Sequence, residues 1–502
     1  MKKGSLIWQV LCALLLALPL AAAAESIDLT ILHVNDTHGR ILPGIDKTIH
    51  PTTPVGGASY LAAMIQAERE KNPDGTLVLS AGDMFQGTPI SNVFKGEPVI
   101  AVMNAMHFDA MAIGNHEFDW GPDALQNLQQ RARFPFLSAN LLDGQGGPPA
   151  GITPLTIMER KGLKIGVIGL TTAEVAYTTK PEYVRDLTVR RPEDVLPAQI
   201  QEARRRGARL IVVLSHSGLD EDKALAQAVD GIDVIVGGHS HTAVTSALLV
   251  GSTLVAQAGS YGFYLGVIHL QIEGQLPGDR RVTGTGGLAL VSAGPNDRPD
   301  PQVAAIVDEY DRKIRVKFSE VVGETSVDLI TSRERETNIG NLMTDAMRAA
   351  AGTEMAFQNS GGLRTNIAQG PITLEQIYTV LPFDNALITM DLSGTTVREL
   401  LEQSVVSEYG VLQMSGVAVT YDASKPAGQR VVDARVNGQP LDPSRTYRVA
   451  TNDFLAAGGD RFTGFTQGKN IAYGDNIRDI FVAYVRKNSP VSPRVEGRAA
   501  SR

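Results

Sequence analysis

Five short apolar runs in the first half of the chain each end in side chains that can bind a metal ion, and this pattern constrains the fold most. Apolar runs of four to six residues are typical of buried β-strands. In layered α/β domains the carboxyl ends of such strands meet at one rim of the sheet, where these folds place their sites. The runs and the polar residues after them are Leu29–Val34 with Asn35–His38, Leu77–Ser80 with Ala81–Asp83, Ala110–Ile113 with Gly114–Glu117, Leu210–Leu214 with Ser215–His216, and Asp233–Val236 with Gly237–His241.

The side chains at these strand ends are carboxylates, imidazoles and one amide, which together suit divalent cations such as Mn²⁺, Zn²⁺ or Co²⁺. Asp36 and His38 are two residues apart, as are His239 and His241, so an extended backbone points both members of a pair to one side. Asp83 has two carboxylate oxygens and can bridge two cations roughly 3.5–4 Å apart. A single motif of this kind is more often a turn or a surface histidine, but five in one domain predict a metal site.

The chain has 502 residues, which exceeds the roughly 250–300 residues that one hydrophobic core supports, so we expect two domains. The polar, proline-rich segment over residues 294–301 is typical of a linker, and the apolar spacing over residues 302–318 predicts a helix. In the second domain we expect a helix around residues 339–351 and a strand over 417–421. The expected division is a signal peptide over residues 1–24, a layered α/β domain over 25–293, a linker and helix over 294–318, a smaller mixed α/β domain over 319–491, and a polar tail over 492–502.

The N-terminus has the pattern of an export signal. Lys2 and Lys3 precede an apolar run over residues 6–20, and four alanines over 21–24 follow it. The run is short for a membrane span, which needs roughly 20 apolar residues, so an uncleaved N-terminal anchor is the less favoured alternative. The single cysteine, Cys12, lies inside this signal. We therefore expect a periplasmic or secreted protein without disulfides or thiolate metal sites.

Charge excludes one class of partner. The formal net charge is −8, and removal of the two lysines of the signal makes it −10. An acidic chain has no general attraction for nucleic acid polymers, so none is expected as a partner. Nothing after the signal suggests a stable membrane anchor, and the sequence leaves the oligomeric state open.

The strand-end motifs resemble those of calcineurin-like metallophosphoesterases, and motifs of the second half are similar to the C-terminal domain of 5′-nucleotidases. The family includes bacterial periplasmic 5′-nucleotidase/UDP-sugar hydrolases and animal ecto-5′-nucleotidases. The resemblance covers nearly the whole chain after the signal. It implies a four-layer β-sandwich flanked by helices, a linker helix and a mixed α/β C-terminal domain. The motifs are Asp36-x-His38, Gly82-Asp83-x-x-Gln86-Gly87, Gly114-Asn115-His116-Glu117, His216, Gly238-His239-Ser240-His241, Asn359-Ser360-Gly361-Gly362-Leu363-Arg364, Leu381-Pro382-Phe383-Asp384-Asn385, and Asn452–Asp460.

The resemblance also implies roles for the residues of the first domain. Some bacterial relatives have glutamine at the position of His241, and histidine matches the ecto-enzymes. His116 is implied as the catalytic histidine that meets the phosphate, with Asp119 orienting its ring. Two divalent metal ions are implied, one held by Asp36, His38, Asp83 and His241, the other by Asp83, Asn115, His216 and His239.

For the second domain, the resemblance implies a nucleotide site. Two aromatic rings would sandwich the base, a carboxylate would hold the ribose, and arginines would face the phosphate, because a guanidinium can bond two oxygens. Arg335 lies in the same charged run as Arg333 and is the alternative to it. The implied residues are Phe383 and Phe454 for the base, Asp460 for the ribose, and Arg333, Asn359 and Arg364 for the sugar and phosphate.

The implied function is that of an exported 5′-nucleotidase, in which a metal-bridging hydroxide attacks the phosphorus of a nucleoside 5′-phosphate. Three alternatives stay open: hydrolysis of UDP-sugars or a sulfur-containing conjugate, hydrolysis of 2′,3′-cyclic nucleotides, and nucleotide binding without catalysis. Asp119 favours the 5′-nucleotidase branch, since asparagine is expected there in the cyclic-nucleotide branch. Because the metals and the base lie on different domains, we also expect a domain-closure step with its hinge near residues 302–318.

Overall fold

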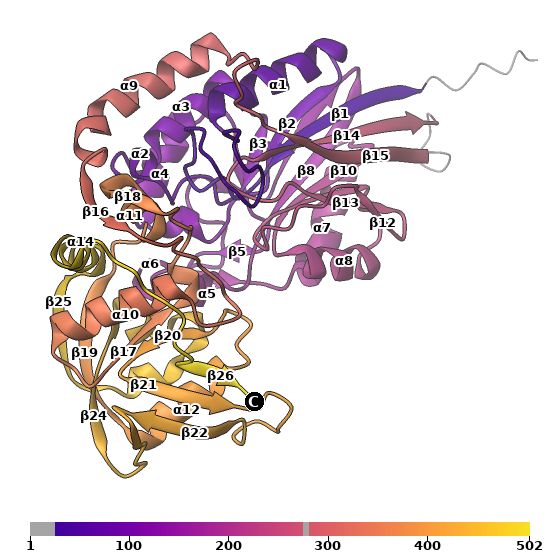
Figure 1. Ribbon diagram of the computed structural model, residues 1–502. Coiled ribbons are helices and arrows are strands. Elements are labelled where there is room, and N and C mark those ends of the chain that lie inside the picture. Colours follow the sequence, from indigo (N-terminus) through magenta and orange to yellow (C-terminus); the bar gives the residue numbers. More distant parts are fainter. Residues whose placement is uncertain (1–25, 275–280) are drawn as a thin grey trace, which may run out of the picture.

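A computed structural model describes residues 26–274 and 281–502. The expected signal peptide over residues 1–24 lies outside the described residues and stays a prediction. No helix in the described part of the chain is both long and apolar enough to span a membrane. The chain forms two domains, of which the N-terminal one contains two large sheets (Figure 1).

The two sheets of the N-terminal domain are each mainly parallel, with antiparallel strands at their edges. The first has the order β15 (Arg281–Leu290), β14 (Tyr264–Glu273), β1 (Ile27–Val34), β2 (Thr76–Ser80), β3 (Ala110–Ala112), β4 (Phe136–Leu137) and β6 (Ile152–Thr153). The second has the order β12 (Leu248–Val250), β13 (Thr253–Gln257), β11 (Val234–Gly237), β10 (Leu210–His216), β8 (Leu163–Thr171) and β7 (Leu155–Arg160). The short strands β5 (Leu141–Leu142) and β9 (Thr188–Val189) pair separately.

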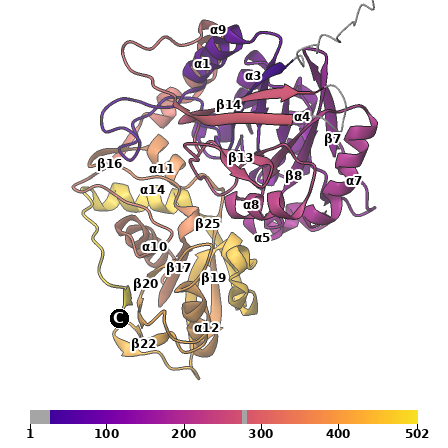
Figure 2. The same ribbon diagram turned by 90° about the vertical axis from the view of Figure 1, so that its right-hand side faces the viewer.

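Alternation of side chains along the strands explains why the sheets stack. Leu29 and Ile31 of β1 and Val212 and Leu214 of β10 belong to one buried cluster between the sheets. Their neighbours point outward, toward helices that cover the two outer faces. This arrangement of helix, sheet, sheet and helix confirms the four-layer fold (Figure 2). The covering helices are α1 (Ala58–Lys71), α2 (Pro89–Asn92), α3 (Glu97–Ala105) and α4 (Pro122–Arg131) on the first sheet, and α7 (Pro192–Arg205) and α8 (Leu219–Ala228) on the second.

The five apolar runs form strands as predicted, namely β1, β2, β3, β10 and β11. They do not share one sheet, however: three belong to the first sheet and two to the second. The predicted rim is therefore shared by two stacked sheets, at the place where the carboxyl ends of their strands meet. The sequence does not assign each run to its sheet, because every run is apolar on both faces and fits either layer of a double sheet equally well.

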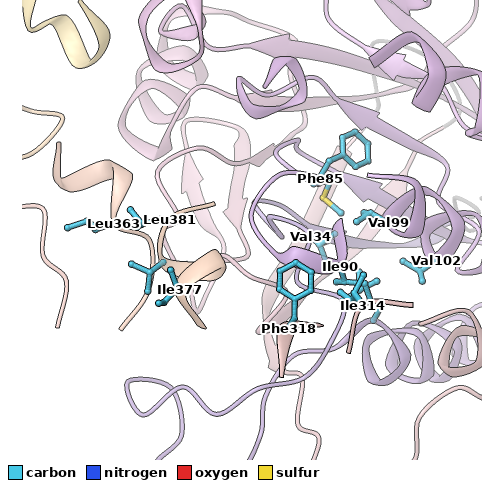
Figure 3. Close-up of a cluster of buried hydrophobic side chains, with 14 of the residues drawn as sticks. Val34, Phe85, Ile90, Val99, Val102, Ile314, Phe318, Leu363, Ile377 and Leu381 are labelled. Carbon is cyan, nitrogen blue, oxygen red and sulfur yellow. The ribbon is translucent and has the colours of Figure 1, made fainter. Parts of the chain in front are cut away.

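Helix α9 (Pro301–Phe318) connects the domains and closely matches the helix predicted over residues 302–318. The side chain of Asp300 caps it by accepting a hydrogen bond from the backbone N–H of Val303. Its buried face, including Ile314 and Phe318, belongs to an apolar cluster that also contains residues of both domains (Figure 3). Phe318 packs edge-to-face on Tyr378, with ring centroids 4.8 Å apart. The core is thus continuous across the domain boundary.

The C-terminal domain packs helices on both faces of a five-stranded sheet. That sheet has the order β20 (Leu412–Ser415), β17 (Met355–Asn359), β24 (Thr446–Asn452), β19 (Ala386–Ser393) and β25 (Lys469–Asn476). A four-stranded sheet has the order β23 (Gln439–Pro440), β22 (Val431–Val436), β21 (Val417–Tyr421) and β26 (Ala499–Ser501), and β16 (Val321–Thr325) pairs with β18 (Gly370–Thr373). The helices are α10 (Asn338–Ala351), α11 (Leu374–Val380), α12 (Gly394–Ser404), α13 (Asp453–Ala456) and α14 (Ile477–Asn488).

Local sequence signals fix several of these elements. Thr337 caps the start of α10 through its side chain, and Gly352 ends that helix in the left-handed conformation. The predicted strand over residues 417–421 is β21. Part of the segment expected as a polar tail forms β26, which pairs in parallel with β21 because that strand offers an open edge.

His33 of β1 is buried, 1% exposed, and neither ring nitrogen has a hydrogen-bond partner within residues 26–274 and 281–502. The chain makes room for the ring through Gly266 of the paired strand β14, where a β-carbon would overlap the imidazole. Burial disfavours the charged form and lowers the pKa of His33 from 6.5 to about 4.

We predict that His33 destabilises the fold at acid pH. Because its folded pKa lies below its unfolded one, the unfolded state takes up the proton first, and stability falls from about pH 6.5 down to about pH 4. The loss is about 3 kcal/mol. His33→Leu should flatten this part of the pH profile of thermal unfolding, whereas the exposed control His269→Gln should keep it. Identical slopes for His33→Leu and the unsubstituted protein would contradict the prediction.

Candidate active site

The predicted metal ligands lie on tight turns that follow the strand ends, and most of them have an unusual backbone conformation. Positive φ angles occur at Asp36 (50°), His38 (49°), Asp83 (53°), His239 (74°) and His241 (56°). Such angles are strained for residues with a β-carbon and cluster at functional sites, where the surroundings enforce them. The strained backbone of these turns therefore sets the direction in which the side chains of the predicted ligands point.

Glycines and one buried glutamate hold these turns together. A β-carbon at Gly114 would overlap Oδ1 of Asp83, so only glycine fits there. Glu117 accepts hydrogen bonds from the backbone N–H groups of Asp83 (3.0 Å), Met84 (2.8 Å) and Gly114 (2.7 Å). Burial raises the pKa of Glu117 to about 7. Glu117 lies in one of the motifs, but its role in holding these turns could not be predicted, because the three N–H groups come from two separate segments.

The first ligand group consists of Asp36, His38 and His241, whose ligand atoms all lie within 4.8 Å of one another. Nε2 of His38 lies 3.0 Å from Nε2 of His241, which in turn lies 3.4 Å from Oδ1 of Asp36. Nδ1 of His38 lies 3.0 Å from the carbonyl oxygen of Gln86. A carbonyl can only accept, so Nδ1 of His38 donates and Nε2 keeps its lone pair for a ligand.

The second ligand group consists of Asp83, His216 and His239. Nε2 of His216 lies 3.1 Å from Oδ2 of Asp83, and its Nδ1 lies 2.7 Å from the carbonyl oxygen of Ala81, to which it donates. Nε2 of His239 donates to Oε2 of Glu174 at 2.9 Å, which leaves Nδ1 as its free nitrogen. In both histidines one nitrogen is held and the other is available, as in metal-binding imidazoles.

Buried polar atoms that lack hydrogen-bond partners test whether divalent cations fit these ligand groups. The side-chain oxygen of Asn115 and Nε2 of His216 are buried, and neither has a hydrogen-bond partner in the described part of the chain. Leaving a buried acceptor unpaired costs about 1–3 kcal/mol. Asp36 and Asp83 are 0% and 2% exposed. Lone pairs and buried negative charge thus meet at one place, which is the donor set that divalent cations require.

His116 lies beside the ligand groups and is fixed by Asp119. Its Nδ1 donates to Oδ2 of Asp119 at 2.7 Å, and Oδ1 of Asp119 accepts from the hydroxyl of Thr179 at 2.8 Å. Nε2 of His116 lies 4.0 Å from Oδ2 of Asp83. His116 also lies close enough to His38 and Asp83 for the three to form a third candidate ligand group.

A cavity of about 450 Å³ between the domains joins these side chains to the second half of the chain. This volume suits a small-molecule ligand. Arg333, the preferred arginine of its charged run, lines the cavity, and Arg335 is not among the lining residues. The predicted residues that line it are Asp83, Asn115, His116, Asp119, His239, His241, Arg333, Asn359, Arg364, Phe383, Phe454 and Asp460.

The aromatic side of the cavity lies directly against the catalytic candidates. The ring of Phe383 stacks on that of His116, with centroids 5.6 Å apart. Phe454 packs over Gly459, where a β-carbon would overlap its ring. Oδ2 of Asp460 accepts from Nδ2 of Asn359 at 2.8 Å, and burial raises the pKa of Asp460 to about 6.

Arg364 links the two domains at the ligand groups. Its Nη2 lies 3.2 Å from Nε2 of His38, and its carbonyl oxygen accepts from the hydroxyl of Tyr261 at 3.3 Å. A guanidinium from the C-terminal domain therefore lies beside the ligands of the N-terminal domain, where it can contact an anionic group bound between them.

Comparisons with known proteins agree with this arrangement. Residues 29–243 match the model of the calcineurin-like phosphoesterases, and residues 321–467 match that of the 5′-nucleotidase C-terminal domain. The human 5′-nucleotidase is 33% identical, over 95% of this chain and 91% of its own. A trifunctional nucleotide phosphoesterase of Bacillus subtilis is 32% identical over 94% of this chain, which spans only 35% of that protein.

A solved structure has the same two-domain fold. The 5′-nucleotidase precursor of Thermus thermophilus superposes with a TM-score of 0.86 and 34% identity, over 95% of this chain and 99% of its own. Fold and site thus define a phosphoesterase of the calcineurin-like class joined to a second domain that lines the same cavity. Within that class, the chain belongs to the 5′-nucleotidase family.

We predict that Gly114→Ala weakens metal binding. The added methyl group displaces the Asp83 carboxylate, and the affinity for Mn²⁺, measured calorimetrically on metal-stripped protein, should fall at least about tenfold. Gly44→Ala is the matched control because its α-carbon faces open space. Equal Mn²⁺ affinities for the two variants would show that the close contact at Gly114 has no bearing on the ligands.

Proposed function

We propose that the chain is an exported 5′-nucleotidase that hydrolyses nucleoside 5′-phosphates to nucleoside and phosphate. The observation that carries the proposal is the shared cavity, which is lined by members of both ligand groups and by the aromatic pair Phe383 and Phe454. A nucleotide requires positive charge for its phosphate and flat apolar faces for its base, and this cavity offers both. The names of the relatives support the same substrate class.

Two divalent cations, Mn²⁺, Zn²⁺ or Co²⁺, are proposed for the ligand groups. When bound, they lower the pKa of water and neutralise the charge on the phosphoryl group. Asp83 is proposed to be shared by both cation sites, because it belongs to a group with His38 and its Oδ2 lies 3.1 Å from Nε2 of His216, whereas Oδ1 of Asp36 lies 4.0 Å from that nitrogen. The first cation is assigned to Asp36, His38, Asp83 and His241, and the second to Asp83, Asn115, His216 and His239.

His116, oriented by Asp119, is proposed to be the proton donor of the reaction. Asp119 accepts from Nδ1 and so holds the ring with Nε2 toward the ligand groups and the cavity. The protonated Nε2 donates to a phosphoryl oxygen as negative charge grows there, and it can then pass the proton to the leaving ribose oxygen.

The C-terminal domain is proposed to select the nucleoside. Phe383 and Phe454 stack on the base, and Asp460, held by Asn359, accepts from the ribose hydroxyls. Arg333 and Arg364 contact the phosphate. Because these groups and the cations lie on different domains, a bound substrate spans the boundary, and a closure step near α9 is part of the proposal.

We propose export on the basis of the signal-like N-terminus. A snake venom 5′-nucleotidase, 32% identical over 94% of this chain, is among the relatives and is consistent with it. Detection of the mature chain, shortened near residue 24, in the periplasmic or secreted fraction would test this part of the proposal.

We predict that AMP is cleaved in preference to the alternative substrates. Product formation should be compared by chromatography after metal stripping and reloading with Mn²⁺, Zn²⁺ or Co²⁺: adenosine and phosphate from AMP, UMP and glucose 1-phosphate from UDP-glucose, and a nucleoside monophosphate from a 2′,3′-cyclic nucleotide. Release from AMP only with metal present is expected. Preference for the cyclic nucleotide, or nucleotide binding without any release, would overturn the proposed function.

His116→Ala is expected to lower kcat for AMP by about 10²–10⁴-fold, the range of general acid catalysis. Both cations should stay bound, since His116 is not among the proposed ligands. His107→Ala serves as the control, because that histidine is exposed and outside the cavity. Loss of one bound Mn²⁺ in His116→Ala would instead identify the side chain as a ligand.

Phe454→Ala should raise the KM for AMP, because stacking of a base on an aromatic ring contributes about 1–3 kcal/mol. An increase of roughly 5- to 100-fold is expected, with a smaller change in kcat. Ribose 5-phosphate has no base and provides the control substrate, whose KM should not change. Equal effects on both substrates would argue against base stacking at this position.

A further inference from the structure

One short segment of the N-terminal domain lies against the C-terminal domain at the edge of the cavity. It contains α5 (Val175–Thr178) and α6 (Pro181–Val184); Figure 1 places both, and Figure 2 places α5, on the side turned toward the C-terminal domain. Lys180 of this segment pairs with Asp453 of the other domain, at 3.2 Å. Asp453 directly precedes Phe454, so the contact lies beside the proposed base site.

Glu174, just before α5, uses its two oxygens in different directions. Oε2 accepts from Nε2 of His239 at 2.9 Å, and Oε1 accepts from the hydroxyl of Tyr409 at 2.9 Å. His239 belongs to the second ligand group, and Tyr409 belongs to the C-terminal domain. One carboxylate therefore contacts a candidate metal ligand and the opposite domain at the same time.

The bond from Tyr409 is supported by a small cluster around it. Tyr177 of α5 packs edge-to-face on Tyr409, with ring centroids 5.5 Å apart. The guanidinium carbon of Arg461 lies 4.5 Å from the centre of the Tyr177 ring and 5.3 Å from that of Tyr409. Arg461 also donates to the Tyr177 hydroxyl at 2.5 Å. It follows Asp460, the proposed ribose residue, so the cluster is continuous with the substrate loop.

The alternative is that the two hydrogen bonds of Glu174 are independent. One would then only orient the ring of His239, and the other would only contribute to the contact between the domains. Geometry argues against this reading. The bond at Oε2 engages Nε2 of His239 and leaves Nδ1 for a cation, which is how carboxylates orient imidazole ligands. The bond at Oε1 can form only while the C-terminal domain lies against α5, so a rigid carboxylate makes the two bonds depend on each other.

We propose that Glu174 is a positioning residue that couples domain closure to the second metal site, with Tyr409 as its contact on the C-terminal domain. This inference rests on the proposed function, because domain closure is expected only if a substrate binds between the domains. Docking of Tyr409 fixes the Glu174 carboxylate, which fixes the ring of His239 with Nδ1 toward the ligand group. The substrate-bound, closed arrangement is thereby the one in which the second site is best ordered.

The first test measures metal binding without any substrate. Metal-stripped, full-length Glu174→Ala is titrated with Mn²⁺ in a calorimeter, and the weaker of its two sites is expected to lose about 10- to 100-fold in affinity. Tyr409→Phe keeps the bond to His239 but removes the docking contact, so one of its sites should lose a smaller factor in Mn²⁺ affinity, about 2- to 5-fold. Glu182→Ala, an exposed change on α6, is the control. Unchanged Mn²⁺ affinity in Glu174→Ala would overturn the proposal, whether or not the protein cleaves AMP.

The second test separates coupling from two independent effects. At saturating Mn²⁺, Tyr409→Phe should raise the KM for AMP about 5- to 10-fold and leave kcat within about twofold, because a less populated closed state lowers the apparent affinity. The double variant Glu174→Ala/Tyr409→Phe should have the KM of Glu174→Ala alone, since the hydroxyl has already lost its acceptor. Tyr473→Phe, at an exposed position, is the matched control. Multiplying effects in the double variant would refute the coupling.

Glu174→Met keeps the proposal testable if the alanine variant folds poorly. Methionine fills most of the same space but offers neither His239 nor Tyr409 an oxygen acceptor. We expect this variant to show both the weakened Mn²⁺ site and the raised KM. Wild-type values for both quantities would refute the role of Glu174, and failure of the unsubstituted protein to cleave AMP would refute the function instead.

Discussion

The burial of two neighbouring carboxylates is the constraint on which the rest of the structure depends. Asp36 and Asp83 follow the adjacent parallel strands β1 and β2 and have almost no contact with solvent. Buried charges are costly unless opposite charge lies beside them. The surrounding imidazoles respond: burial alone would lower the pKa of His216, but Asp83 raises it to about 10. Two stacked sheets provide the rigid, enclosed place in which divalent cations can neutralise this charge more completely than imidazoles.

Much of this arrangement could be predicted because its signals are local. Buried strands and the polar residues after them are visible as short patterns, and the family motifs added Phe383, Phe454 and Asp460. The division of the strands over two sheets was not visible, since pairing depends on residues far apart in the chain. Glu174 follows β8, which ends at Thr171, but it belongs to none of the motifs, so its position beside His239 and Tyr409 in the folded chain identifies it.

In the proposed function, the substrate is selected at the boundary between the domains. The N-terminal domain has candidate ligands for cations but few groups for a nucleoside, and the C-terminal domain has the aromatic pair without cation ligands of its own. Arg364 and Lys180 cross the boundary in opposite directions, toward His38 and Asp453 respectively. Relatives that differ in substrate can therefore keep one domain's chemistry and change what the other domain presents to it.

The apolar cluster around α9 also determines how the two domains unfold. Val34 of β1, Phe318 of α9 and Ile377 of α11 belong to one continuous core, whereas other clusters stay within a single domain. Loss of the C-terminal domain's structure exposes the apolar side chains of α9 that pack on it, such as Phe318 against Tyr378, which costs roughly 25 cal/mol for each Å² of apolar surface. The two domains are thus thermodynamically joined, and unfolding of one withdraws stability from the other.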